Sequence, residues 1–150
     1  MKDEYRKLTT KEALDLIKLL KELCQKKAIV LPNAGEKIEF NVQAIENNNT
    51  FIVNVSHNNI NNQKYTFQGR TMEHNIPLIR LDINPFGVHQ NHDGTKIYGT
   101  HLHIYNENYD MGDAIPFSID NPDLYNYCLA FFKKFNIMTN DNDIIYQEQL

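Results

Sequence analysis

The segment that decides the fold is residues 78–105, LIRLDINPFGVHQNHDGTKIYGTHLHIY. From Ile79 to Ile83 aliphatic and charged residues alternate, which leaves Arg80 and Asp82 on the strand face opposite the aliphatic residues. One apolar and one polar face are typical of an antiparallel sheet that packs on a core through one side only. We therefore expect a half-buried strand here, with two charged side chains on its outer face.

The same segment ends in a second alternating strand. Leu102 and Ile104 point to one face of it, and His101, His103 and Tyr105 point to the other. If both strands place their aliphatic residues in one core, their polar residues share the opposite face of the sheet. The candidate catalytic residues on this face are Arg80, Asp82, His101, His103 and Tyr105.

The connection between these strands is long for a hairpin and carries His89, His92 and Asp93 ahead of Gly94. Long connections inside compact domains are often functional, so we predict that these three residues bind substrate. Polar side chains are also expected on the outer face of an antiparallel sheet that has no function, where cross-strand ion pairs stabilise it. The clustering of four histidines in one short segment favours a site.

Working outward, the chain predicts a series of short strands between two helices. Strands are expected at 37–44, 51–56, 65–70, 78–83 and 97–105, with a short edge strand at 143–147 (DIIYQ). Short sequential strands with short connections indicate an antiparallel meander. The predicted fold is a single α+β domain over residues 1–150, in which an N-terminal and a C-terminal helix pack on one face of a sheet of about five to six strands.

The first predicted helix runs from about Thr10 to Lys27. Thr9 and Glu12 match a capping box, and apolar residues then recur at helical spacing. Its lysines are expected on a solvated face: Lys11, Lys18, Lys21, Lys26 and Lys27.

The second predicted helix has Asn121 as N-cap and Pro122 at its first position, and ends near Phe135. Its apolar stripe contains Leu124, Tyr127, Cys128, Phe131, Phe132 and Phe135. Cys24 and Cys128 each lie on the apolar stripe of a predicted helix, so we expect two buried free thiols without a chemical role.

Composition excludes some classes of function. A formal net charge of -4 and a pI near 5.8 argue against a broad basic surface for nucleic acid, and leave room only for a local basic pocket. No apolar run is long enough to cross a bilayer, and the charged N-terminus lacks the apolar stretch of a signal peptide. We expect a cytoplasmic protein with no membrane partner.

Two kinds of chemistry fit the predicted site. In metal-independent cleavage of RNA or a nucleotide, His101 and His103 would act as acid and base, Arg80 would stabilise charge on phosphorus, and Asp82 would orient a histidine. Tyr105 would contribute a hydroxyl or stack on a base. This mechanism needs no cofactor.

In the second, His101 and His103 form a His-x-His pair for a divalent metal such as zinc, completed by Glu107, His89 or His92. A third alternative is a non-catalytic acidic binding protein, for which the partner would be a host defence protein. These alternatives stay open at the level of sequence.

The order LIRLDINP, HQNHDG and GTHLHIY, followed by an amphipathic helix, resembles an uncharacterised family of small phage and prophage proteins with Arg-x-Asp and His-x-His elements. This resemblance implies a mobile-element setting and no known activity. More distantly, the layout is similar to TumE-type toxins of toxin-antitoxin pairs. That likeness implies a toxin role for Arg80, Asp82, His101 and His103, with an antitoxin as partner.

Overall fold

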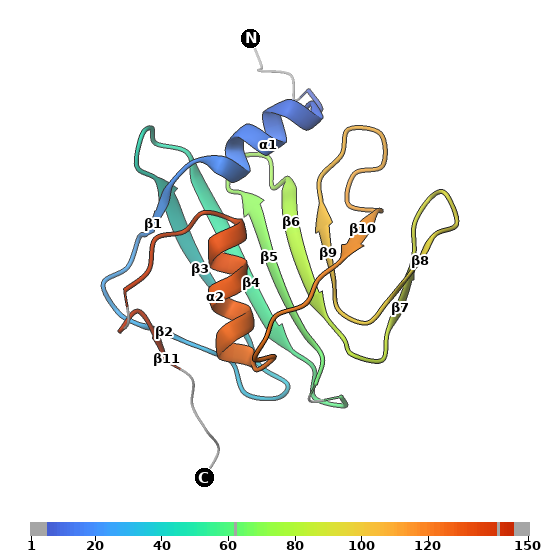
Figure 1. The fold of residues 1–150 in the computed structure, drawn as a ribbon. Helices are drawn as coiled ribbons and strands as arrows, with labels where there is room; N and C mark the ends of the chain where they lie inside the picture. Colours follow the sequence, from blue (N-terminus) through green and yellow to red (C-terminus); the bar gives the residue numbers. More distant parts are fainter. Residues whose placement is uncertain (1–5, 62, 141, 146–150) are drawn as a thin grey trace.

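A seven-stranded antiparallel sheet in the strand order β1-β3-β4-β5-β6-β9-β10 forms the centre of the computed structural model, which describes residues 6–61, 63–140 and 142–145 (Figure 1). The strands are β1 (Lys21–Leu23), β3 (Lys37–Ala44), β4 (Thr50–His57), β5 (Tyr65–Thr71), β6 (Pro77–Ile83), β9 (His101–Ile104) and β10 (Ala114–Pro116). Two short pairs stand apart from this sheet: parallel β2 (Ile29–Val30) with β11 (Ile144–Ile145), and the hairpin of β7 (Val88–Gln90) with β8 (Lys96–Tyr98). The α+β class and the antiparallel sheet are confirmed.

Helix α2 (Leu124–Lys134) covers one face of the sheet (Figure 1). Its phenylalanine side chains meet those of the strands, as in the stacked pair Phe67–Phe131, whose ring centroids lie 5.6 Å apart. Gly69 leaves room for the helix, since a Cβ there would lie 2.5 Å from a ring carbon of Phe135. The predicted apolar stripe of this helix is confirmed, although its N-cap is Asp123 rather than Asn121.

The opposite face of the sheet, which α2 leaves uncovered, is polar across five strands. We call it the open face. The register brings together Lys37, Glu39, Asn54, Ser56, Thr66, Gln68, Arg80, Asp82, His101 and His103 on this face.

Helix α1 (Thr10–Lys18) lies across the end of the sheet (Figure 1) and begins at the predicted capping box of Thr9 and Glu12. The predicted continuation to Lys27 is wrong. The chain leaves the helix after Lys18, and Lys21 pairs in β1 with Ala44 of β3. Backbone hydrogen bonds to a strand distant in sequence replace those of the helix, a tertiary effect that local spacing does not contain.

Lys21 is buried, so its predicted place on a solvated face is wrong. The side chain has no exposed surface, and its Nζ donates hydrogen bonds to the carbonyls of Ile17, Leu19 and Phe135 at 2.7–2.8 Å. These carbonyls lie at the C-terminal ends of both helices, where the helix dipole favours a cation. Burial nevertheless lowers the pKa of Lys21 to about 7.

The predicted strand at 97–105 is divided into β8 and β9. Gly99 separates them with a positive φ of 82°, a conformation that glycine adopts without strain. The predicted edge strand at 143–147 begins as β11, which pairs with β2 and not with the main sheet, and its positions 146–147 lie outside the described residues.

The two thiols differ. Cys128 is buried as expected, but Cys24 is exposed, because the segment that carries it is not helical. Within the described part of the chain, neither helix is long and apolar enough to cross a membrane.

Candidate functional site

The candidate site lies where β6 and β9 pair at the open face. The register sets Arg80 opposite His103 and Asp82 opposite His101. Oδ2 of Asp82 lies 3.4 Å from Nε2 of His101 and 3.2 Å from Nε2 of His103. The structure thus brings these four predicted residues together around one carboxylate oxygen.

Arg80 contacts both oxygens of the Asp82 carboxylate. Its Nε lies 3.0 Å from Oδ1 and 3.2 Å from Oδ2 of Asp82, and its Nη2 donates to Oδ2 at 3.1 Å. A paired contact of this kind fixes the plane of a carboxylate. Arg80 therefore orients Asp82 toward the two histidines.

His89 reaches the site from the hairpin of β7 and β8. Its ring centroid lies 5.2 Å from that of His101 and 4.8 Å from that of His103. The hairpin is docked on β10 by Asn91, which exchanges two hydrogen bonds with the backbone of Ala114. One ring nitrogen from each of the three histidines lies within 4.8 Å of the others.

Each of the three imidazoles has its second ring nitrogen against a backbone carbonyl. The pairs are His101 Nδ1 with Gly99 O at 2.9 Å, His103 Nδ1 with Asp113 O at 3.1 Å, and His89 Nε2 with Gly112 O at 2.7 Å. A carbonyl can only accept, so in each pair the ring nitrogen carries the proton. In the neutral form of each ring, the remaining nitrogen is therefore a lone-pair donor.

His101 and His103 differ in how far their side chains are exposed to solvent. The side chain of His103 is 1% exposed, and that of His101 is 9% exposed. Nε2 of His103 is buried and makes no aligned hydrogen bond within the described residues, although it lies 3.2 Å from Asp82. A buried polar atom without an aligned partner is unfavourable unless the site supplies one.

The negative charge of Asp82 is stabilised by Arg80 and by the two histidines beside it. Burial alone would raise the pKa of Asp82, but its contacts with His101, His103 and Arg80 outweigh that effect and hold the pKa well below its usual range. In turn, Asp82 raises the pKa of His101. The carboxylate is therefore ionised across the neutral range.

The distances from Asp82 to the two histidines fit the edge of a tetrahedral zinc site, whereas the three histidine nitrogens are spaced more widely, within 4.8 Å of one another. Two ligand atoms bound tetrahedrally at about 2.0 Å from one zinc ion lie about 3.3 Å apart. The separations of 3.4 and 3.2 Å from Asp82 to His101 and His103 agree with that edge. Histidine ligands of metals commonly donate their second N–H to a carbonyl or carboxylate, which fixes the tautomer.

Other predicted site residues lie elsewhere. Tyr105 is buried, and its hydroxyl donates to the carbonyl of Leu8, so the fold itself uses this hydroxyl. Glu107 accepts from the backbone N–H of Thr10 and does not belong to the histidine cluster. The side chain of His92 contacts Asp113.

Asp93 caps the turn of the hairpin by accepting from the N–H of Thr95. Of the three loop residues predicted to bind substrate, only His89 joins the site. The sequence contained no signal for the three carbonyls of Gly99, Gly112 and Asp113, because they lie in the turn after β8 and in the connection ahead of β10.

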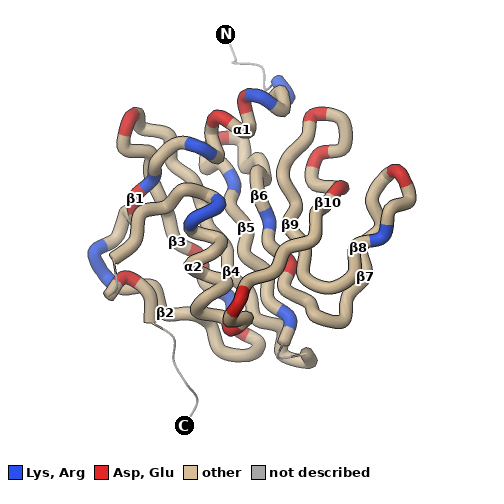
Figure 2. Tube along the Cα trace, in the orientation of Figure 1, with Lys and Arg blue, Asp and Glu red and all other residues tan. Residues whose placement is uncertain are grey.

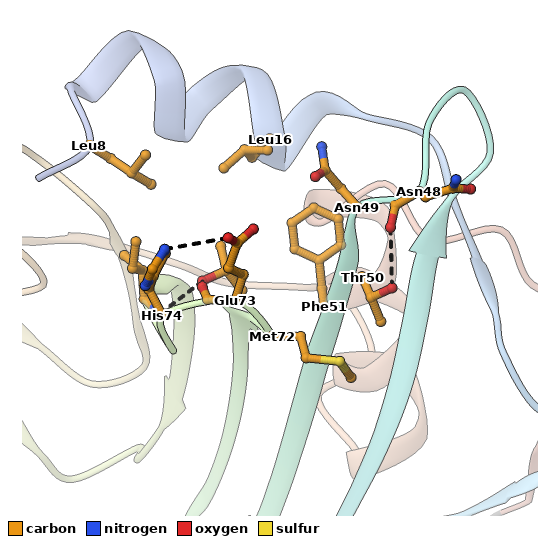
Figure 3. Close-up of a pocket in the computed structure, with 11 residues that line it drawn as sticks. Leu8, Leu16, Asn48, Asn49, Thr50, Phe51, Met72, Glu73 and His74 are labelled. Carbon is orange, nitrogen blue, oxygen red and sulfur yellow. Dashed lines mark hydrogen bonds and ion pairs between the residues drawn. The ribbon is translucent and has the colours of Figure 1, made fainter. Parts of the chain in front are cut away.

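A separate cavity of about 360 Å³ lies under α1. Figure 3 shows Leu8 and Leu16 on one side of it, facing Phe51, Met72 and the turn of Glu73 and His74. None of the predicted site residues lines this cavity. Figure 2 shows acidic and basic residues distributed over much of the trace.

The comparisons with known proteins give a family and no activity. A model described as a family of unknown function, DUF6978, matches residues 8–137, so the chain belongs to this family. Neither the curated proteins nor the solved structures gave a match. The expected membership of an uncharacterised family is confirmed, whereas the phage setting and the likeness to TumE-type toxins remain predictions.

Proposed function

We propose that the protein is a metal-dependent enzyme that hydrolyses a phosphate ester. The metal would be a divalent transition ion bound by Asp82, His101 and His103, with His89 as a further ligand from the hairpin. The observation that carries the proposal has two parts. His101 and His103 each hold Nε2 within 3.4 Å of Asp82 while Nδ1 faces a backbone carbonyl. One ring nitrogen from each of His89, His101 and His103 lies within 4.8 Å of the others. Zinc fits this donor set, and iron(II) and manganese(II) also use imidazole and carboxylate ligands.

Arg80 favours an anionic substrate. Its side chain is 32% exposed and lies next to the centre, so one side of the guanidinium holds Asp82 while the rest faces solvent. A divalent metal there would activate water for attack on phosphorus. The P–O bond to the leaving group breaks, and the departing oxygen takes up the proton that water has given up. Arg80 would stabilise the negative charge that develops on the phosphoryl oxygens.

The burial of His103 favours a ligand role over acid-base catalysis. An acid or base must come within hydrogen-bonding reach of the substrate, and a side chain that is 1% exposed does so poorly. Ligand atoms of a metal need no such access. The same geometry still supports a second candidate, metal-independent cleavage of RNA or a nucleotide, through the contact of Asp82 with His101 beside the partly exposed Arg80.

One experiment separates these two functions. Metal-stripped protein is titrated with Zn²⁺ by calorimetry and with Co²⁺ by visible spectroscopy, and cleavage of RNA and of a phosphodiester model substrate is followed with added metal and in EDTA. We expect one metal per chain, with activity only in the metal-loaded form. His101→Ala and Asp82→Asn should each weaken binding by more than tenfold. His74→Gln, outside the cluster, is the matched control.

Each result has a definite meaning. Metal binding that is unchanged in the His101 and Asp82 variants would refute the proposed centre. Cleavage that persists in EDTA and is lost only in His101→Ala would replace the proposal with the metal-independent mechanism. Circular dichroism of each variant confirms that the fold is retained.

A further inference from the structure

A polar pocket of about 280 Å³ lies on the open face, away from the histidine cluster. It opens between the ends of β3, β4 and β5. Its lining consists of Gly35, Lys37, Ser56, His57, Asn58, Asn59, Lys64 and Thr66.

The chemistry of this lining suits an anion. Two lysines, two hydroxyls and two amides supply hydrogen-bond donors, and no carboxylate is among the lining residues. Within the described ranges, neither Lys37 nor Lys64 has an ion-pair partner, so both ammonium groups are available. Lysine is a common point-charge ligand for phosphate.

The pocket and the proposed metal centre lie on one cross-strand row. Lys37 pairs with Ser56, Ser56 with Thr66, Thr66 with Asp82, and Asp82 with His101. With strands about 4.8 Å apart, roughly 14 Å separates Lys37 from Asp82. At the 3.4 Å rise of a stacked strand, about four nucleotides span this distance, so a single nucleotide is too short to reach both points.

The carboxylates on and beside this face have partners within the fold. Glu39 accepts a hydrogen bond from Asn54, and its Oε2 lies 3.5 Å from Nη2 of Arg70. Glu36, between the pocket residues Gly35 and Lys37, accepts a hydrogen bond from the backbone N–H of Asn33. Asp82 is paired with Arg80. Ser56 and Thr66 lie between the pocket and the centre and offer only hydroxyl groups.

We propose that this pocket binds a backbone phosphate of a single-stranded nucleic acid, and that the strand crosses the open face to the centre at Asp82 and His101. The inference names the substrate class of the proposed enzyme, and its catalytic consequence rests on that proposed function. Binding in the pocket itself requires no metal.

The test uses metal-free protein in EDTA, so a failure of the metal centre does not affect it. A short single-stranded RNA, a mononucleotide and inorganic phosphate are each titrated while amide signals are followed by NMR. With RNA, we expect shifts at Lys37, Ser56 and Thr66 together with Asp82 and His101, at one common affinity. Inorganic phosphate should shift the pocket signals alone.

Matched variants identify the contacts. Lys37→Gln with Lys64→Gln should reduce the salt dependence, the slope of log K against log salt, by about 0.7 for the one lost phosphate contact. Lys26→Gln with Lys27→Gln removes the same charge from exposed positions outside the pocket and should leave the slope nearly unchanged. Equal affinity and slope in the two double variants would overturn the proposal. A mononucleotide that binds as tightly as the RNA would also overturn it.

Discussion

Replacing Lys21 with methionine tests how the fold tolerates a buried ammonium. In the folded protein Nζ is fully buried and donates to three carbonyls, while the rings of Phe51 and Phe135 lie 5.0 and 4.1 Å from it. Burial lowers its pKa from 10.5 to about 7. Methionine retains most of the length of the side chain and removes both the charge and the hydrogen bonds.

The pKa difference fixes the sign and size of the effect. Between pH 7 and pH 10.5 the unfolded chain holds the Lys21 proton more often than the folded protein does. The free energy of unfolding therefore rises with pH through this window, and the penalty for burying the charge is fully present below pH 7. From pH 7 to pH 9 the gain from this group is about 2 kcal/mol.

The assay is urea unfolding followed by circular dichroism at a series of pH values from 6 to 10. The wild-type protein should gain about 2 kcal/mol relative to Lys21→Met between pH 7 and pH 9. Lys18→Met, an exposed lysine of α1, is the control and should run parallel to the wild type. If Lys21→Met also runs parallel, the three carbonyls and the two rings hold the ammonium at its ordinary pKa, and the argument from burial is refuted.

Three further outcomes follow from the packing. Gly69→Ala should destabilise the fold by about 1–3 kcal/mol in urea unfolding, because its Cβ would overlap the ring of Phe135; an unchanged midpoint would contradict the close packing of α2. Tyr105→Phe should cost about 1 kcal/mol of stability through one lost hydrogen bond and leave metal uptake intact; reduced uptake would return Tyr105 to the site. In the folded protein a thiol reagent should modify Cys24 but not Cys128, since burial raises the pKa of the Cys128 thiol; equal labelling rates would show that α2 opens readily.

Residue-by-residue alternation was sufficient to predict which strand residues of the candidate site share one face of the sheet. Ile79 and Leu102 had to face a core, so Arg80, Asp82 and His101 had to share the other face once the two strands paired. The stripe of α2 was predictable for the same reason, because the helical period alone places its apolar residues on one side. Such patterns depend on neighbours in sequence, and the sequence contains them in full.

Contacts between distant segments decided the rest. No sequence pattern around Lys21 predicts that it is buried. It is buried because the C-terminal ends of α1 and α2 meet around its side chain. His89 lies in the histidine cluster because Asn91 docks its hairpin on β10. Glu107, which the sequence also offered as a ligand, does not lie in this cluster. The sequence by itself determined which side chains share a face of the sheet, through the two-residue period of a strand. Only the tertiary structure decided which of them are buried and which lie close together, because both depend on contacts with the docked hairpin and with the connection ahead of β10.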